Sequence, residues 1–206
     1  MDDRKQKSRI AFDAQAPTYD SAAQGAHARG LYPHVLTALA RVPCGGELLD
    51  VGCGTGALAR LVLKQDPTCR VTGLDLAPNM VAQARANLEG FADRVRLVEG
   101  DSDRLPFREE SFDAAWCNDS FHHYPDPERV AFEVWRVLRP GGLFAMGDVA
   151  LPAPARVIMN AAMPFSNEGD VRIYARGELE RILGRWFSSV VWRRVGASAC
   201  LVEAWK

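Results

Sequence analysis

The 206-residue sequence lacks several features that assign a chain to a specialised class of protein. It contains no run of about 18 apolar residues, so it predicts no membrane span. Positive and negative residues nearly balance, at 25 and 26, and a chain without a basic excess is not expected to wrap nucleic acid. The opening "MDDRKQKSRIAFDAQ" has no apolar core of a secretion signal. We therefore expect a cytoplasmic protein with neither a membrane span nor a nucleic-acid partner.

The five cysteines form no recognisable framework. They are odd in number, scattered, and free of any C-x-x-C spacing. This pattern favours reduced thiols over a disulfide framework or a zinc site, and we expect no metal. A cluster of four positive residues near the start is expected to form a solvated helix face: Arg4, Lys5, Lys7 and Arg9.

Short apolar strands alternate with helical stretches along most of the chain. Because such alternation requires crossover connections, it predicts an α/β, doubly wound sheet that is mainly parallel, with helices on both faces. The last two strands flank Gly196 closely and predict an antiparallel hairpin. The expected helices are 8–20, 26–42, 57–65, 79–90, 127–138 and 176–186, and the expected strands are 47–51, 70–75, 95–100, 112–118, 143–149, 188–195 and 199–206.

The stretch "LLDVGCGTG", residues 48–56, joins the first strand to a helix through three glycines. Such a turn lies at the carboxyl edge of the sheet, where ligands of these folds bind, and glycine allows a ligand to approach the backbone. The spacing fits G-x-G-x-G, but Ala57 also completes the dinucleotide pattern G-x-G-x-x-G/A. Asp75, at the end of the second strand, is placed to bind ribose hydroxyls. The turn alone leaves a nicotinamide dinucleotide and a sulfonium nucleoside open.

Four motifs in order distinguish these possibilities: "FDAQAPTYD" (12–20), "LLDVGCGTG" (48–56), "GDSDRLPF" (100–107) and "LRPGG" (138–142). Over residues 8–150 the sequence resembles the class I S-adenosylmethionine (SAM)-dependent methyltransferases, in the type-11 branch that includes the ubiquinone and menaquinone C-methyltransferases. The resemblance implies a Rossmann-like sheet of seven strands whose last pair forms a reversed hairpin.

The resemblance also implies which residues bind SAM. Asp50 would favour the ammonium group, the backbone of Asn118 would contact the methionine part, and Tyr19 would close over the sulfonium. Both ribose hydroxyls would bind the carboxylate of Asp75. The complete implied set is Tyr19, Asp50, Gly52, Cys53, Gly54, Gly56, Asp75, Leu76, Met80, Asp101, Ser102 and Asn118.

The adenine end of that set has four members. Leu76 and Met80 would pack against the adenine face. Asp101 would accept a hydrogen bond from the exocyclic amine, and the backbone N–H of Ser102 would donate to a ring nitrogen. These assignments follow from the resemblance, position by position.

The acceptor side carries weaker signals. His122 and His123, in "FHHYPDP", are candidate general bases because imidazole titrates near neutrality, and Asp119 is a further candidate. Alternatively, these side chains only stabilise their loop. The strand before them is not followed by "NPPY", the usual mark of methylation at planar nitrogens of nucleic acids and proteins, so a small-molecule acceptor is favoured. The loop 150–178 is either an apolar acceptor lid or an ordinary cover of the core, with Met159, Met163, Phe165 and Tyr174 as its large apolar side chains.

We expect one domain over residues 1–206, with a helical lid (1–42), a cofactor-binding core (43–149) and an acceptor-side segment (150–206) ending in a helix and hairpin. The favoured function is methyl transfer from SAM to an oxygen, carbon or nitrogen of a small molecule. A nicotinamide-dependent oxidoreductase and a non-catalytic SAM-binding protein are the alternatives. The sequence leaves the oligomeric state open.

Overall fold

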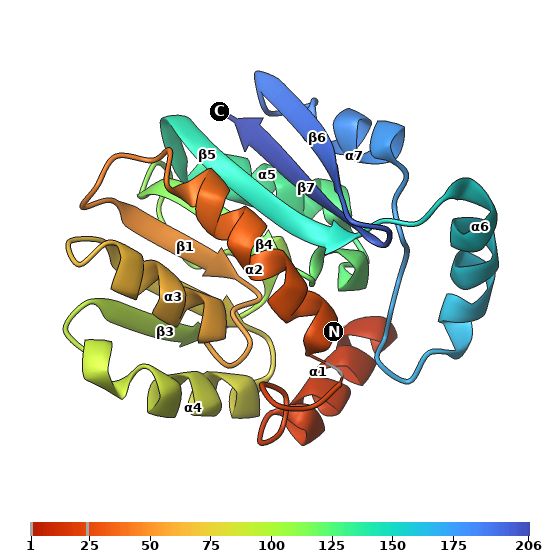
Figure 1. Ribbon diagram of the computed structural model, residues 1–206, viewed down its shortest axis with the longest axis horizontal. Coiled ribbons are helices and arrows are strands. Elements are labelled where there is room, and N and C mark those ends of the chain that lie inside the picture. Colours follow the sequence, from red (N-terminus) through yellow and green to blue (C-terminus); the bar gives the residue numbers. More distant parts are fainter. Residues whose placement is uncertain (1, 24) are drawn as a thin grey trace.

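Seven strands form one sheet in a computed structural model that describes residues 2–23 and 25–206 (Figure 1). The strand order is β3-β2-β1-β4-β5-β7-β6. The first five strands are parallel to their neighbours, whereas β7 is antiparallel to both β5 and β6. The predicted mainly parallel sheet with a C-terminal antiparallel hairpin is therefore confirmed. The strands are β1 (Glu47–Val51), β2 (Arg70–Asp75), β3 (Val95–Glu99), β4 (Phe112–Asn118), β5 (Leu138–Val149), β6 (Ser189–Val195) and β7 (Ala199–Trp205).

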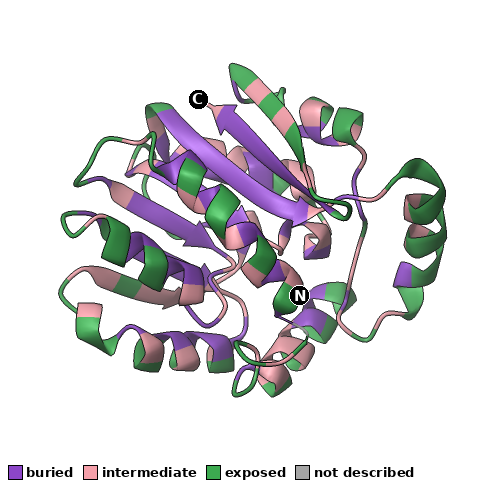
Figure 2. Cartoon of the chain, viewed as in Figure 1, coloured by how far each residue is buried: buried purple, intermediate pink, exposed green. Residues whose placement is uncertain are grey.

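Helices cover both faces of the sheet and bury its apolar side chains (Figures 1 and 2). Consecutive residues of a strand point to opposite faces, so Leu48 packs with α2, α3 and α4, and Leu49 packs with α5 and α7. This two-sided burial explains why the central strands are apolar without alternation. The helices are α1 (Asp3–Gln15), α2 (Ala26–Leu39), α3 (Ala57–Gln65), α4 (Pro78–Asn87), α5 (Pro127–Val137), α6 (Ala153–Ala162) and α7 (Arg176–Leu183), with short 3₁₀ turns η1 (Glu89–Phe91), η2 (Ser102–Arg104), η3 (Phe121–His123) and η4 (Met163–Phe165).

The first helix begins earlier than the sequence predicts. It was expected over 8–20 but spans Asp3–Gln15, because the carboxylate of Asp2 caps it by accepting the N–H of Arg4 at 2.8 Å. It ends before Pro17, because proline has no backbone N–H to continue the helical hydrogen-bond ladder. The shift brings the start of α1 over the carboxyl ends of the strands.

The "RPGG" segment was expected to be a turn before the fifth strand. Instead β5 begins at Leu138, which pairs with Phe112, and the pairing resumes between Leu143 and Ala114. The intervening residues form an irregularity in the strand, with Gly141 in the left-handed region at φ 76°. The strand thus runs through the motif.

The segment 150–178, expected to be a loop, contains α6 and η4. In Figure 1 α6 lies apart from the sheet, and none of its residues, all of which the structure describes, is buried. Phe165 is 85% exposed, whereas Met163 and Tyr174 are buried. None of the segment's large apolar side chains is among the described residues that line the pocket below, so of the two alternatives the structure does not form the apolar acceptor lid.

The five cysteines, all in the described part of the chain, are free thiols, as predicted. Within residues 2–23 and 25–206, no helix combines the length and the apolar character that a membrane crossing requires.

Candidate active site

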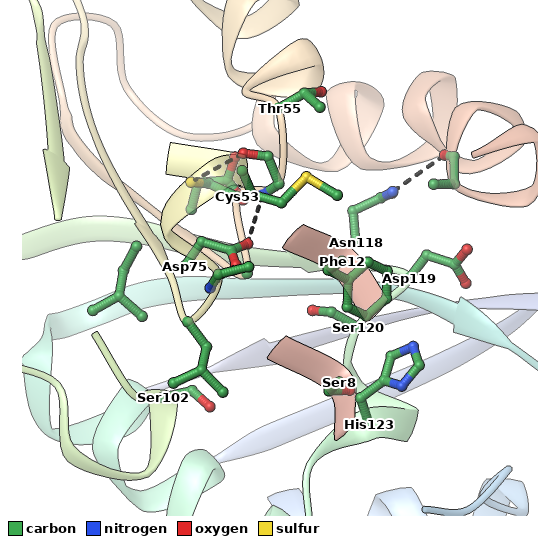
Figure 3. Close-up of a pocket in the computed structure, with 18 of the residues that line it drawn as sticks. Ser8, Phe12, Cys53, Thr55, Asp75, Ser102, Asn118, Asp119, Ser120 and His123 are labelled. Atoms are coloured by element: carbon green, nitrogen blue, oxygen red, sulfur yellow. Dashed lines mark hydrogen bonds between the residues drawn. The ribbon is translucent and has the colours of Figure 1, made fainter. Parts of the chain in front are cut away.

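A pocket lies at the carboxyl edge of the sheet, where the strand order reverses between β1 and β4 (Figure 3). Ligands of open α/β sheets bind at this switch point. The pocket encloses about 980 Å³, part of it open to solvent, which suits a small-molecule site. Its lining includes eleven of the twelve residues expected to bind SAM: Tyr19, Asp50, Gly52, Cys53, Gly54, Asp75, Leu76, Met80, Asp101, Ser102 and Asn118.

The glycine turn is fixed by Asp75, at the end of β2. Its Oδ2 accepts the N–H of Gly54 at 2.8 Å, and its Oδ1 accepts the N–H of Ala77 at 2.9 Å. Burial raises the pKa of the Asp75 carboxyl, while these backbone donors oppose the rise. A carboxylate oxygen can accept two hydrogen bonds, so each oxygen of Asp75 can also accept a hydrogen bond from a ligand.

Two glycines of the turn have different surroundings although both lie in the left-handed region, at φ 51° for Gly54 and 74° for Gly56. A Cβ on Gly54 would meet no described atom within 4 Å and would project into open space. A Cβ on Gly56 would come within 2.7 Å of Leu88 Cδ1. Gly56 is not among the described lining residues, and its missing Cβ allows α3 to pack closely against α4; its contact with the cofactor stays a prediction.

The floor of the pocket beside the turn is formed by Asp50, which is 2% exposed. Burial and the nearby carboxylate of Asp75 both raise the pKa of Asp50 well above its usual value. Cys53 is buried as well, and the same two causes, burial first, raise the pKa of its thiol. The thiol is therefore protonated near neutral pH and is not a nucleophile.

One end of the pocket contains an ion pair that the sequence did not predict. Both carboxylate oxygens of Asp101 lie 2.8 Å from Lys5 Nζ, which also bonds Asp103. Lys5 is 8% exposed, and Arg9 lines the pocket. The expected solvated face of basic residues is therefore wrong for these two positions, because α1 docks over the site.

The middle of the pocket is covered by the N-terminal segment. Tyr19 and Phe12 pack edge to face with ring centroids 6.1 Å apart. Asn118, at the end of β4, uses its side-chain Nδ2 to donate to the carbonyl of Ala28 at 3.1 Å (Figure 3). This bond engages one N–H of the side-chain amide with α2, and the backbone contact of Asn118 with the methionine part of SAM stays a prediction.

At the other end lie Asp119 and His123, two of the three expected catalytic residues. Burial and the nearby charge of His122 lower the pKa of His123 well below its usual value, so this imidazole is neutral at pH 7. Its Nδ1 lies 3.3 Å from Asp170 Oδ1. The contact does not have hydrogen-bond geometry, because Nδ1 has no hydrogen-bond partner among the described residues, and the neutral ring offers one of its two nitrogens to accept a proton.

His122, the third expected residue, is not among the described residues that line the pocket. Its Nδ1 lies 2.6 Å from Asp148 Oδ1, and its backbone N–H donates to Asp148 Oδ2 at 3.1 Å. Burial alone would lower the pKa of His122, but the carboxylates, above all Asp148, raise it to about 9. His122 is therefore mainly a cation at pH 7. Its ring packs against that of His123, with centroids 4.1 Å apart.

The acidic and imidazole groups at this end come close enough to suggest metal ligands. His122, His123 and Asp170 have ligand atoms within 4.8 Å of one another, as do Asp119, His122 and Asp148. A protonated His122 between Asp148 and Asp170 accounts for the arrangement without an ion, because metal binding requires a neutral imidazole. The expected absence of a metal stays a prediction.

Sequence reasoning missed Lys5, His27, Asp148 and Ser120. Asp148 lies near the end of β5, and the rule that strand ends converge could have identified it. Ser120 follows β4, and its Oγ lies 2.9 Å from the hydroxyl of Tyr124. The two helical residues gave no sequence signal, because their contacts depend on how α1 and α2 dock.

Comparisons with known proteins agree with this geometry. A family model described as a methyltransferase domain matches residues 49–146. The demethylmenaquinone methyltransferase of Thermus thermophilus is 34% identical over 164 residues, which are 75% of this chain and 74% of that protein. The 27-O-demethylrifamycin SV methyltransferase of Amycolatopsis mediterranei is 42% identical over 115 residues, which are 54% of this chain and 42% of that protein. The chain spans less than half the length of several curated relatives that it matches.

A solved structure shows the same fold over nearly the whole chain. It is the complex of the Haloferax volcanii Trm112 methyltransferase activator with a candidate methyltransferase, with a TM-score of 0.82, 22% identity and 96% coverage of both chains. The sheet order, the position of the pocket and the match to the Thermus protein lead to one family. The chain belongs to the class I SAM-dependent methyltransferases.

Proposed function

We propose that this protein transfers a methyl group from SAM to a nucleophilic atom of a small molecule. One pocket carries the proposal, because its lining runs from Asp101 and Asp75 at one end to Asp119 and His123 at the other. SAM supplies an activated methyl group on a sulfonium when it is bound. The chain must therefore bind two ligands in one continuous space and align them, and alignment alone can supply effective molarities of about 10⁵–10⁸ M.

We assign the cofactor to the end with Asp75. The carboxylate of Asp75 would bind the ribose hydroxyls, and the open space above Gly54 would admit the methionine part. The buried carboxylate of Asp50 favours a cationic group beside it, because a positive charge would offset the burial and repulsion that raise its pKa. Leu76, Met80 and the backbone of Ser102 would surround the adenine.

The acceptor would then lie between Asp119 and His123. The neutral imidazole of His123 is able to take a proton from a hydroxyl as the new bond forms. His122 is held by Asp148 and would act as a positioning residue. The relatives include an erythromycin 3''-O-methyltransferase, a 27-O-demethylrifamycin SV methyltransferase and a demethylmenaquinone methyltransferase, whose names support a small-molecule acceptor.

Binding and turnover test the proposal separately. Calorimetric titration with S-adenosylhomocysteine and with NADH should show binding of the nucleoside and none of NADH; the reverse result would support the oxidoreductase alternative. Isotope-labelled SAM is then incubated with a panel of phenols, quinols, amines and thiols. Nucleoside binding without label transfer to any member would favour the non-catalytic alternative.

Three expectations stay predictions: the division into a lid (1–42), core (43–149) and acceptor-side segment (150–206), the cytoplasmic location, and the absence of a nucleic-acid partner. The first has a structural argument in its favour, because α1 reaches both ends of the pocket. Lys5 contacts Asp101 at one end, and Phe12 packs edge to face against His123 at the other, with ring centroids 5.1 Å apart.

A further inference from the structure

Asp119, at the acceptor end of the pocket, has an unusual backbone. Its φ is 57°, in the left-handed region that residues with a Cβ rarely occupy. Its N–H donates to the carbonyl of Gly147 at 2.7 Å, which fixes this conformation against β5. Backbone strain of this kind concentrates at functional sites, where the surrounding structure maintains it. The conformation directs the Asp119 side chain to the pocket wall, where it is 10% exposed.

One oxygen of the Asp119 carboxylate is held by a residue from a distant part of the chain. His27 Nδ1, in the first turn of α2, lies 2.7 Å from Asp119 Oδ1. Within residues 2–23 and 25–206, this is the one side chain that hydrogen-bonds to the carboxylate, so Oδ2 is left for a ligand. The hydrogen bond from His27 therefore both orients the carboxylate and leaves half of it available.

The position of His27 follows from the packing of α2. Val35 and Leu31, on the buried side of the helix, are 0% and 1% exposed. The bond from Asn118 Nδ2 to the carbonyl of Ala28 fixes the first turn beside the end of β4. Because the helix is held at both places, His27 approaches Asp119 at a defined distance, and the pair forms a fixed part of the wall.

The charge of the pair favours a particular ligand chemistry. The hydrogen bond to Asp119 raises the pKa of His27 although burial opposes the rise. A cationic partner favours the ionised carboxylate, and an ionised carboxylate only accepts hydrogen bonds. The carboxylates of Asp148 and Asp170 lie nearby, beside His122. Those two carboxylates are engaged by His122 and are not among the described lining residues, so Asp119 Oδ2 is the carboxylate acceptor that this end of the pocket presents to a donor group.

We propose that His27 is a positioning residue that holds the Asp119 carboxylate so that Oδ2 binds a hydroxyl or amino group of the methyl acceptor. The inference rests on the proposed function for the identity of the ligand, and it adds that the acceptor carries a hydrogen-bond donor near the methylated atom. No proton transfer through His27 is required. A hydrogen bond from the acceptor to the charged Asp119 carboxylate would both increase the affinity for the acceptor and orient it toward the methyl group.

The experiment compares hydroquinone with 1,4-dimethoxybenzene, in which a methyl group replaces each hydroxyl proton and no hydrogen-bond donor remains. Each is titrated by NMR into protein saturated with S-adenosylhomocysteine. The wild-type protein is expected to prefer hydroquinone by about tenfold or more. His27→Phe, which removes the Nδ1 donor, should abolish most of that preference, and His27→Asn, which restores a donor near the position of Nδ1, should recover part of it.

His34→Asn is the matched control, because His34 is exposed on the same helix. Asp119→Asn should reduce the preference as strongly as His27→Phe, while S-adenosylhomocysteine affinity stays within twofold in all variants. Equal binding of the two probes, no binding of hydroquinone to the wild type, or an unchanged preference in His27→Phe would each overturn the proposal. Equal losses in His27→Phe and His27→Asn would also overturn it, since a merely structural role predicts that result.

The two proposals fail in different ways. If the hydroquinone preference depends on His27 but the protein transfers no label from SAM, the proposed methyl transfer is contradicted and the positioning role of His27 is supported. Label transfer with a preference that ignores His27 would do the opposite.

Discussion

The two ends of the pocket are built in different ways. At the nucleoside end, two backbone N–H groups fix Asp75. One belongs to Ala77, two residues later in the chain, and the other to Gly54, in the turn that follows the adjacent strand β1. At the acceptor end, Asp119 and His122 are fixed by His27 and Asp148, which belong to other elements. The first end is a local property of strand–turn–helix units, whereas the second depends on how distant elements meet.

The α1 helix connects the two ends. Lys5 bonds Asp101 at the nucleoside end, and Phe12 packs edge to face against His123 at the acceptor end with centroids 5.1 Å apart. Asp13 Oδ1 also accepts the backbone N–H of Asn79 at the start of α4, at 2.8 Å. A single helix therefore contacts both the nucleoside end and the acceptor end of the pocket.

The largest effect is expected from substituting the two glycines of the turn, because one substitution should mainly lower stability and the other should mainly lower cofactor affinity. Gly56→Ala forces an L-residue into left-handed backbone, at about 1–2 kcal/mol, and overpacks Leu88, at about 1–3 kcal/mol more. Gly54→Ala incurs only the backbone cost but places a methyl group in the pocket. Urea unfolding should show the greater loss for Gly56→Ala, and calorimetry should show the greater loss of S-adenosylhomocysteine affinity for Gly54→Ala. The opposite ranking would contradict the assignment of the turn.

The next largest effect concerns the nucleoside end. Asp75→Ala removes a charged hydrogen-bond acceptor and should lower S-adenosylhomocysteine affinity by about 1.5–3 kcal/mol, roughly 10- to 150-fold. Glu99→Ala is the matched control, because Glu99 pairs with Asp75 in register and is exposed. Circular dichroism verifies that both variants fold. An unchanged affinity in folded Asp75→Ala would show that ribose binds elsewhere.

A smaller effect is expected at the acceptor end and depends on pH. The folded-state pKa of His122, raised to about 9, lies above its ordinary value. Its contribution to stability is therefore fully present below about pH 6.5 and is lost as the pH rises through 9, by an amount on the order of 1–3 kcal/mol. Urea unfolding at pH 6 and pH 9.5 should show a larger decrease for the wild type than for His122→Gln. Parallel decreases in the two proteins would exclude a protonated His122.

The smallest effect is expected for the connection between the ends. Lys5→Gln removes the cation shared by Asp101 and Asp103 and should loosen α1 by about 1 kcal/mol, since both carboxylates stay partly exposed to water although Lys5 is buried. Hydrogen exchange of α1 amides should become faster than in the control Lys7→Gln, because Lys7 is exposed on the same helix. Identical exchange in the two variants would mean that the ion pair does not hold the helix.

The sequence allowed more of the nucleoside end than of the acceptor end to be predicted. Asp75 was expected from the rule that the ends of parallel strands meet at one edge of the sheet, and Asp101 was implied by the family resemblance. His122 and His123 were recognised as a pair, but sequence alone did not show that only His123 faces the pocket. Their adjacent positions hide this difference, because η3 turns the two rings to different neighbours.

The N-terminal basic cluster shows the same limit. Periodicity and charge predicted a solvated face, yet Lys5 is buried against two carboxylates. A sequence pattern describes how residues are spaced on a helix, but it does not say which face docks. The docking of α1 depends on contacts with Glu168 and Asn79, which lie 153 and 66 residues away from their partners in the helix.

The sequence by itself determined the alternating strands and helices, the glycine turn and the acidic residues at the ends of β2 and β3. Each of these depends on local backbone preferences and on an edge that every parallel sheet shares. Only the tertiary structure decided that Gly56 lets α3 and α4 pack closely, that Lys5 bonds Asp101, and that His27 holds Asp119. These contacts join residues far apart in the chain, and their formation depends on the packing angle and register of whole elements, which no short stretch of sequence specifies.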